Sequence, residues 1–394
     1  MSISAHLFKY IDINPKEFLA KGTLAKKISM DKLQPFCRDI PEYEIAKFSG
    51  GAKFRNSDTI MARITPCLEN GKTAMVNILE PDEVGFGSTE FIVFRAKEGY
   101  TDPDFVYYLV KSSIVRDPAI KSMVGSSGRQ RVQIDVVQNL VIPFPSLSEQ
   151  RKIASILKSL DDKIALNTKI NDNLAEQARA VFQAWFIDYK PFGGAVPPAW
   201  HPSTLGQIAE MKTDSWSPEK NPGIVVEHYS IPAFDEQHYP VFEVASGIKS
   251  NKYILNSNSV MISKLNPDTK RIWRPLCLSA HSVCSTEFIV YEAKKQEQRD
   301  YIYSILDSTP FLNYLCSHTT GSTNSRQRAT PKSTLDFTLC LPPDPIIEDF
   351  CRIVTPMYDL IASKIVENQS LAKTRDSLLP RLMSGEIDVP AVEP

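Results

Sequence analysis

The sequence predicts an α+β fold made by internal duplication. Two tandem α+β domains are each followed by a long helix, and the two helices pair as an antiparallel coiled coil with pseudo-two-fold symmetry. Three observations predict this architecture. The hexapeptide STEFIV occurs at 88–93 and again at 285–290, and RQR triplets recur at 129–131 and 326–328 with the same offset. Each copy also ends in a stretch of about forty residues with apolar side chains at helical spacing.

The composition is typical of an ordinary soluble globular protein of two or three domains. The chain has 394 residues, of which 42% are hydrophobic and 23% charged. No apolar run is long enough to cross a bilayer, and the first residues have no signal-peptide pattern. The seven cysteines include no CxxC and are expected to be reduced thiols, so we expect a cytoplasmic protein with no membrane partner. Because the net charge is −1, any nucleic-acid site must be a local basic patch.

The repeat extends beyond the hexapeptide and sets the expected domain boundaries. GSTEFIVFRA at 87–96 matches CSTEFIVYEA at 284–293, and GSSGRQRVQ matches GSTNSRQRA further along. Each globular segment contains short β-rich runs, followed after TEFIV by helical patterns, which indicates α+β domains. The expected parts are residues 1–147 for the first domain, 148–190 for the first long helix, 191–345 for a linker and the second domain, and 346–394 for the second long helix and tail.

The STEFIV strand is expected to be structural. Phe91, Val93, Phe288 and Val290 should alternate into a core, while the threonines Thr89 and Thr286 should point away from it.

The first long helix should run from Glu149 to about Tyr189, with Ser148 as its N-cap and Ser146 as the alternative. The second should run from about Pro345 to Ser384 and end at Gly385. Its two prolines, Pro356 and Pro380, should kink it or mark breaks, because proline lacks a backbone donor.

Both helices show a heptad seam with polar residues near the middle. The simplest partner for each helix is the other one; the alternative is that each helix packs on its own domain. A buried polar pair would fix the register at some cost in stability. The residues expected to pair the helices are Ile153, Leu157, Leu160, Ile164, Asn167, Asn171, Leu174, Val354, Met357, Ile361, Asn368 and Leu371.

No catalytic constellation is present in the sequence. It lacks a GxxxxGK[ST] loop, an HExxH motif, a strand-linked GxGxxG and the Asn/Asp-Pro-Pro-aromatic tetrapeptide of amino-methyltransferases. Cys277, His281 and Cys284 do not have the spacing of a zinc site and lack a second ligand pair. We therefore predict no catalytic residue and no metal site.

Basic, glycine-flanked loops are the most informative feature for function. Glycine and serine let backbone amides approach a phosphate, arginine forms bidentate contacts with phosphate or guanine, and glutamine can read adenine. The alternative is that these are solvated surface loops. A second basic cluster surrounds Trp273, and Arg63 and Lys72 are its counterpart in the first copy. The candidate DNA-binding residues are Arg63, Lys72, Lys121, Arg129, Gln130, Arg131, Lys264, Lys270, Arg271, Arg274, Arg326, Gln327, Arg328 and Lys332.

Two such domains on a rigid paired-helix spacer would contact two short DNA segments separated by untouched base pairs. Because the copies differ in detail, the two half-sites should differ in sequence. The competing hypothesis is a scaffold that binds no DNA, in which a coiled coil carries two protein-binding domains.

The chain resembles the specificity (S) subunit of Type I restriction-modification enzymes over nearly its whole length. The resemblance rests on PSLSEQRKIASILKSLDDKIALNTKINDNL, on its C-terminal echo KIVENQSLAKTRDSLLPRLMSGEI, and on PPAWHPSTLGQIAE at the start of the second domain. The first domain opens with KEFLAKGTLAKKISMDKL, which lacks the family's Trp…Leu-Gly start, and IIEDFCRIV replaces SEQRKI in the second helix.

This resemblance implies a non-catalytic chain with two target recognition domains, each reading half of a bipartite asymmetric DNA sequence. It implies that the helices set the gap and bind two modification subunits, which use S-adenosylmethionine to methylate adenine. It also implies two restriction subunits that hydrolyse ATP, with Mg, to translocate and cut DNA. No cofactor is expected in this chain.

Overall fold

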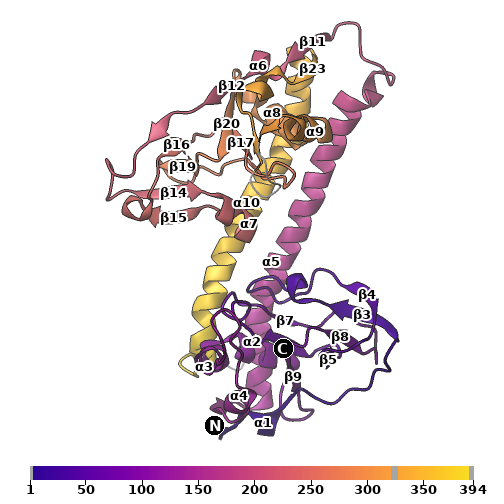
Figure 1. Ribbon diagram of the computed structural model, residues 1–394, viewed down its shortest axis with the longest axis vertical. Coiled ribbons are helices and arrows are strands. Elements are labelled where there is room, and N and C mark those ends of the chain that lie inside the picture. Colours follow the sequence, from indigo (N-terminus) through magenta and orange to yellow (C-terminus); the bar gives the residue numbers. More distant parts are fainter. Residues whose placement is uncertain (1–2, 321–326, 390–394) are drawn as a thin grey trace. The chain divides into compact units, whose positions relative to one another are not determined.

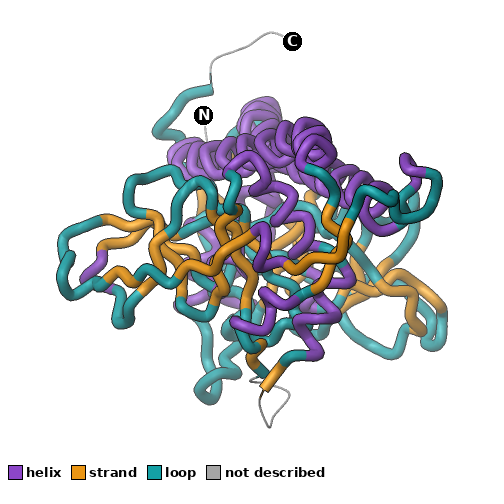
Figure 2. The backbone as a smooth tube through the Cα atoms, turned by 90° about the horizontal axis from the view of Figure 1, so that it is seen from above, coloured by secondary structure: helices purple, strands orange, loops and turns teal. Residues whose placement is uncertain are grey.

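The structure is a computed structural model that describes residues 3–320 and 327–389, and the chain forms two compact units. Unit 1 contains residues 1–166 and 368–394, and unit 2 contains residues 167–367. Two long helices, α5 (Leu147–Phe182) and α10 (Asp344–Met383), each contribute to both units (Figure 1). Strands occur in the globular parts of the chain, and the long helices carry none (Figure 2).

The globular part of unit 1 is built on two four-stranded sheets, with strand orders β2-β9-β6-β7 and β4-β3-β8-β5. The first sheet is antiparallel throughout, and in the second β3 pairs with β8 in parallel. A separate pair, β1 with β10, ties the start of the chain to the segment before α5. The elements are β1 (Ile3–His6), α1 (Leu7–Tyr10), β2 (Ile11–Ile13), β3 (Leu24–Ile28), η1 (Met30–Lys32), β4 (Glu44–Lys47), β5 (Lys53–Phe54), β6 (Thr59–Ala62), β7 (Thr73–Met75), β8 (Gly85–Gly87), β9 (Phe91–Ala96), α2 (Pro103–Lys111), α3 (Ser113–Lys121), α4 (Ile134–Gln138) and β10 (Val141–Phe144).

Unit 2 repeats this arrangement. Its sheets have the orders β12-β20-β17-β18 and β13-β16-β19-β14-β15, and β14 pairs with β19 in parallel as β3 does with β8. The elements between the long helices are η2 (Gln183–Ile187), η3 (Lys190–Phe192), β11 (His201–Thr204), α6 (Leu205–Ile208), β12 (Ala209–Lys212), β13 (Ser215–Trp216), β14 (Val225–Tyr229), α7 (Ile231–Gln237), β15 (Val241–Val244), η4 (Ala245–Gly247), β16 (Lys252–Ile254), β17 (Ser259–Ser263), β18 (Ile272–Trp273), β19 (Ser282–Ser285), β20 (Phe288–Ala293), η5 (Gln296–Gln298), α8 (Arg299–Asp307), α9 (Thr309–Ser317), β21 (Thr319–Thr320), β22 (Arg328–Ala329), η6 (Lys332–Asp336) and β23 (Thr338–Leu341). The α+β fold class and the two domains, each followed by a long helix, are therefore confirmed.

The sequence predicted one continuous strand over STEFIV, but in the structure the strand covers only the second half of the hexapeptide. In both copies the threonine and the glutamate form a turn, and β9 and β20 begin at the phenylalanine. Ser88 precedes the turn, whereas Ser285 ends strand β19. Phe91 and Val93 enter one hydrophobic core as predicted, but Ile92 and Phe94 enter a second core with α2. The strand is buried on both faces because it lies inside a sheet that is covered on both sides. Thr89 therefore lies in the turn and not on an outward strand face.

The long helices pair within each unit. In unit 1, Ile153 and Leu157 share a core with Leu379 and Leu382. In unit 2, the rings of Phe182 and Phe350 lie 5.9 Å apart, and these residues share a core with Val354 and Tyr358. Rising residue numbers on α5 meet falling numbers on α10, so the helices run antiparallel in both units.

Each helix also packs on the domain that precedes it, so the two alternatives are not exclusive. Ile153 belongs to the same core as Phe105 of α2, and Phe350 to the same core as Tyr301 of α8. All twelve residues predicted to pair the helices are buried or half-buried. At the predicted polar position Asn167, the side-chain amide donates to Glu367 at 3.1 Å within unit 2.

The helix ends differ from expectation at two points. Ser146, not Ser148, caps α5: its hydroxyl accepts from the Glu149 amide at 3.3 Å, and its own amide donates to the Glu149 carboxylate at 2.8 Å. Helix α10 continues through Pro356 and Pro380 without a break, because its apolar face stays buried and each proline removes only one donor.

Gly385 follows α10 with a φ of 76°, the left-handed conformation expected of a C-terminal glycine. Among the described residues, no helix has the combination of length and apolar character that a membrane span requires.

Candidate DNA interface

Three segments that are distant in sequence meet in unit 1 at the STE turn. They are the residues after β6 (63–65), the turn itself (88–90) and the RQR loop (129–131). The Arg63 amide donates to the Glu90 carbonyl at 2.9 Å, and the Thr65 amide donates to the Gln130 carbonyl at 3.0 Å. The Val132 amide donates to the Arg63 carbonyl at 2.9 Å. We call this meeting point the Glu–Arg junction, and its backbone bonds place the repeated motifs side by side.

The side chain of Glu90 links the three segments of the junction. Its carboxylate accepts from Nη2 and Nε of Arg131, at 2.8 Å and 3.0 Å, and from Nε of Arg63 at 3.2 Å. These guanidinium contacts, that of Arg131 above all, lower the pKa of Glu90. The acid therefore stays ionised and holds two arginines at one place.

Unit 2 contains the same junction. The Lys264 amide donates to the Glu287 carbonyl, and the Asn266 amide donates to the Gln327 carbonyl, both at 2.9 Å. The Glu287 carboxylate accepts from Nε and Nη2 of Arg328 at 3.0 Å and 3.2 Å. Lys264 stands where the first copy has Arg63. Arg326, another candidate, lies outside the described residues.

Other candidates lie on the exposed rim of these loops. Lys121, Arg129 and Lys332 are exposed, while Gln130 and Gln327 are half-buried. Within residues 3–320 and 327–389, the guanidinium of Arg129 forms no ion pair. Positive charge at the rim is therefore open to a ligand, in contrast to that of Arg131.

The RQR loop of the first copy turns sharply at Gly125, where φ is 137°. A Cβ there would lie 2.9 Å from the Arg129 carbonyl oxygen, so a larger residue would push the loop open. Lys72, in contrast, is directed inward, and its ammonium donates to the Met30 carbonyl at 2.8 Å.

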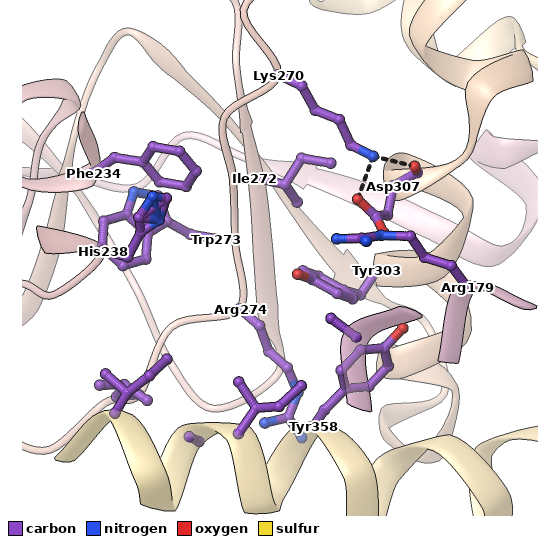
Figure 3. Close-up of a pocket in the computed structure, with 15 residues that line it drawn as sticks. Arg179, Phe234, His238, Lys270, Ile272, Trp273, Arg274, Tyr303, Asp307 and Tyr358 are labelled. Atoms are coloured by element: carbon purple, nitrogen blue, oxygen red, sulfur yellow. Dashed lines mark hydrogen bonds and ion pairs between the residues drawn. The ribbon is translucent and has the colours of Figure 1, made fainter. Parts of the chain in front are cut away.

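The second basic cluster is neutralised by acids that the local sequence does not reveal. Lys270 pairs with Asp307, and Arg271 pairs with Asp235 at 2.6 Å. Lys270 also lines a cavity of about 360 Å³ within unit 2, where Figure 3 shows it beside Asp307 and opposite Trp273.

Arg274 lines the same cavity and is almost enclosed, with its side chain 10% exposed. It pairs with Asp300 at 2.8 Å and with Asp359 at 2.6 Å. Contacts to these two acids raise its pKa, although burial alone would lower it. The DNA-binding assignments of this cluster stay predictions, and the geometry favours a structural role for Arg274.

No cluster of metal-ligating side chains occurs within the described ranges, and all seven cysteines are free. Cys284 is buried in strand β19, and burial raises the pKa of its thiol. His281, by contrast, is exposed.

Residues 18–176 match the family described as the Type I restriction modification DNA specificity domain. The chain is 25% identical to the Type I restriction enzyme MjaIX specificity subunit of Methanocaldococcus jannaschii, over 73% of this chain and 69% of that one. It is also 25% identical to the HindI specificity subunit of Haemophilus influenzae, over 76% of this chain and 81% of that one. Residues 18–176 therefore carry the DNA specificity domain of the Type I restriction family, and most of the chain is similar to specificity subunits of that family. Members of this family contribute DNA recognition and not catalysis.

The fold agrees with a solved member of the family. A crystal structure of the Type I restriction-modification S subunit from M. genitalium aligns with a TM-score of 0.58 and 17% identity, over 99% of this chain and 97% of that one.

Glu90 and Glu287 were not among the residues singled out from the sequence. They stand in the repeated hexapeptide, and their partner arginines stand in the repeated triplet at the same offset. That shared offset was the available signal, because two motifs that recur together can form a single structural unit.

Proposed function

We propose that this specificity subunit reads a bipartite, asymmetric DNA sequence, one half through the Glu–Arg junction of each unit. The observation that carries the proposal is the recurrence of this junction, with the same backbone bonds and the same acid–arginine pair, in a chain of this family. The copies differ at Arg63 and Lys264, which supports two half-sites of different sequence.

The long paired helices are proposed to fix the gap between the half-sites and to dock the partner subunits. Relatives are named as specificity subunits of Type I restriction enzymes, which supports assembly with modification and restriction subunits. We propose two modification subunits that bind S-adenosylmethionine and methylate adenine, and two restriction subunits that use ATP and Mg. In this scheme the chain acts in the cytoplasm, holds no cofactor and determines which DNA sequence the complex acts on.

Single-molecule methylation sequencing tests this function most directly. A host that carries the modification subunit is sequenced with and without this chain. We expect a bipartite adenine-methylated motif that appears only with the chain. If no motif appears, and the purified chain shows none of the salt-dependent DNA binding that phosphate contacts produce, the chain is a protein-binding scaffold and the proposal fails.

The spacer role has its own test. Asn167 of α5 contacts Glu367 of α10, so one heptad inserted after each of these residues keeps the helices in register. Seven helical residues add about 10 Å, or roughly three base pairs at 3.4 Å each. The methylated motif should keep both half-sites and lengthen its gap. Altered half-sites with an unchanged gap would refute the spacer role.

A further inference from the structure

We propose that Glu90 and Glu287 are positioning residues for base recognition. Each holds the last arginine of its RQR loop against the STE turn, so that the loop presents the same side chains at every encounter with DNA. Arg131 and Arg328 are then anchors of the loop and not phosphate contacts. The inference rests on the proposed function and adds to it the residues that shape each reading surface.

The geometry of the ion pair supports an anchoring role. In both copies two nitrogens of one guanidinium, Nε and Nη2, donate to one carboxylate, which fixes the plane of the arginine as well as its position. The glutamates are partly shielded, with side chains 22% exposed for Glu90 and 30% for Glu287. Shielding from water strengthens such a contact relative to a fully solvated pair.

The backbone around the pair is held on both sides. The Glu90 amide donates to the Ser88 hydroxyl at 3.1 Å, and the Arg131 amide donates to the Val124 carbonyl at 2.9 Å. In the second copy, the Glu287 amide donates to Ser285 at 3.2 Å. The ion pair therefore joins a fixed turn to a fixed loop stem, and Arg129 and Gln130 lie directly before the anchored residue.

The electrostatic cost of a carboxylate beside DNA supports a positioning role for Glu90 and Glu287. A carboxylate on a surface that faces DNA repels phosphate, so it weakens binding unless it does something that offsets this cost. Both copies keep the glutamate together with its arginine, although residue 63 and its counterpart 264 differ. A direct contact from glutamate to a cytosine amino group is the competing role, but both oxygens of each carboxylate already accept from an arginine.

The test uses the full chain in complex with its modification subunits, on the motif defined by methylation sequencing. Affinities are measured for the cognate duplex and for duplexes with single base changes in either half-site, for Glu90→Gln, Glu287→Gln, Arg131→Ala and the Glu90→Gln/Arg131→Ala double variant. Glu44→Gln is the matched control, because its carboxylate pairs with Lys27 in unit 1 on an exposed strand.

Glu90→Gln should lower base discrimination at one half-site by about tenfold, a loss within the range of a single base contact, and leave the other half-site unchanged. Glu287→Gln should do the same at the opposite half-site. Arg131→Ala should match Glu90→Gln, and the double variant should add nothing further.

Three results would overturn the inference: unchanged discrimination, both variants affecting the same half-site, or a uniform loss of affinity with a lower thermal midpoint and intact discrimination. Loss of preference for cytosine alone, with Arg131→Ala behaving differently, would assign direct reading to the glutamate instead. If the wild-type chain defines no motif at all, the proposed function has failed, and that result is separate from these.

Discussion

The buried ion pair between the long helices gives the sharpest stability prediction. Within unit 1, Arg375 of α10 donates to Asp161 of α5 at 2.5 Å, and both side chains are 8% exposed. The second oxygen of Asp161 accepts from the Tyr108 hydroxyl at 2.7 Å. Burial opposes the charge on Arg375, but contacts with Asp376 and Asp161 raise its pKa.

Arg375→Met leaves the Asp161 carboxylate buried with only a tyrosine as its partner. Removing one member of a buried pair costs about 3–5 kcal/mol, which lowers the thermal midpoint of a domain of this size by roughly 10 °C. The assay is urea and thermal unfolding of the full chain, followed by circular dichroism.

Arg381→Ala is the control, since Arg381 lies on the same helix and pairs with Glu386 at 2.8 Å, but both side chains are more than half exposed. Its cost should stay below about 1 kcal/mol. Asp161→Asn combined with Arg375→Met removes both charges, keeps an acceptor for Tyr108, and should come within about 1 kcal/mol of the parent. Equal losses for Arg375→Met and Arg381→Ala would refute the claim that burial sets the cost.

Three further predictions follow from other parts of the structure. Burial lowers the pKa of Lys111 from its ordinary value of 10.5 to about 8 in the folded chain. Between pH 8 and 10.5 the unfolded chain keeps a proton on Lys111 that the folded chain has lost, so the free energy of unfolding should rise with pH across that window. Lys111→Met should raise the free energy of unfolding at pH 7 by up to roughly 3 kcal/mol and abolish the rise, as measured by urea unfolding at pH 7 and 10. Arg129→Ala should make the slope of log affinity against log salt shallower by about 0.9, whereas Arg131→Ala should change it less, because Glu90 already neutralises that charge; equal changes would contradict this. Phe350→Ala empties a buried site among aromatic rings of α5 and α8 and should cost about 3–5 kcal/mol in urea unfolding.

The local signals in the sequence predicted the scaffold well. Apolar spacing located both long helices to within a few residues, and the repeated motifs predicted two domains of one fold. These features depend on residues close to one another in the chain. The N-cap was misplaced by two residues because Ser146 and Ser148 both precede acidic Glu149 in the sequence. Only the capping geometry distinguishes them.

The site was harder to predict because its charges are set by residues far apart in sequence. The cluster around Trp273 is rich in basic residues along the chain, with Asp268 as the one acid in its segment, 263–275. In the fold, Asp300 and Asp307 of α8 and Asp359 of α10 reach it and neutralise it. A local count of charges cannot anticipate such contacts, because they form only when the domain packs on the helices.

The two copies also show which interactions survive when a duplicated chain diverges. In the first copy the Tyr108 hydroxyl of α2 donates to Asp161 on its helix, and at the equivalent place in the second copy Ser304 of α8 bonds Tyr358 at 3.1 Å. The tyrosine lies on the globular domain in the first copy and on the long helix in the second, yet each copy has a hydrogen bond between its domain and its long helix. The Glu–Arg junction keeps its glutamate, the paired arginine and the backbone bonds, although Arg63 is replaced by Lys264 in the second copy. Because the docking contact exchanges its side chains and the glutamate–arginine pair does not, this pair is under a stricter geometric demand than packing alone imposes, which supports the positioning role proposed for it.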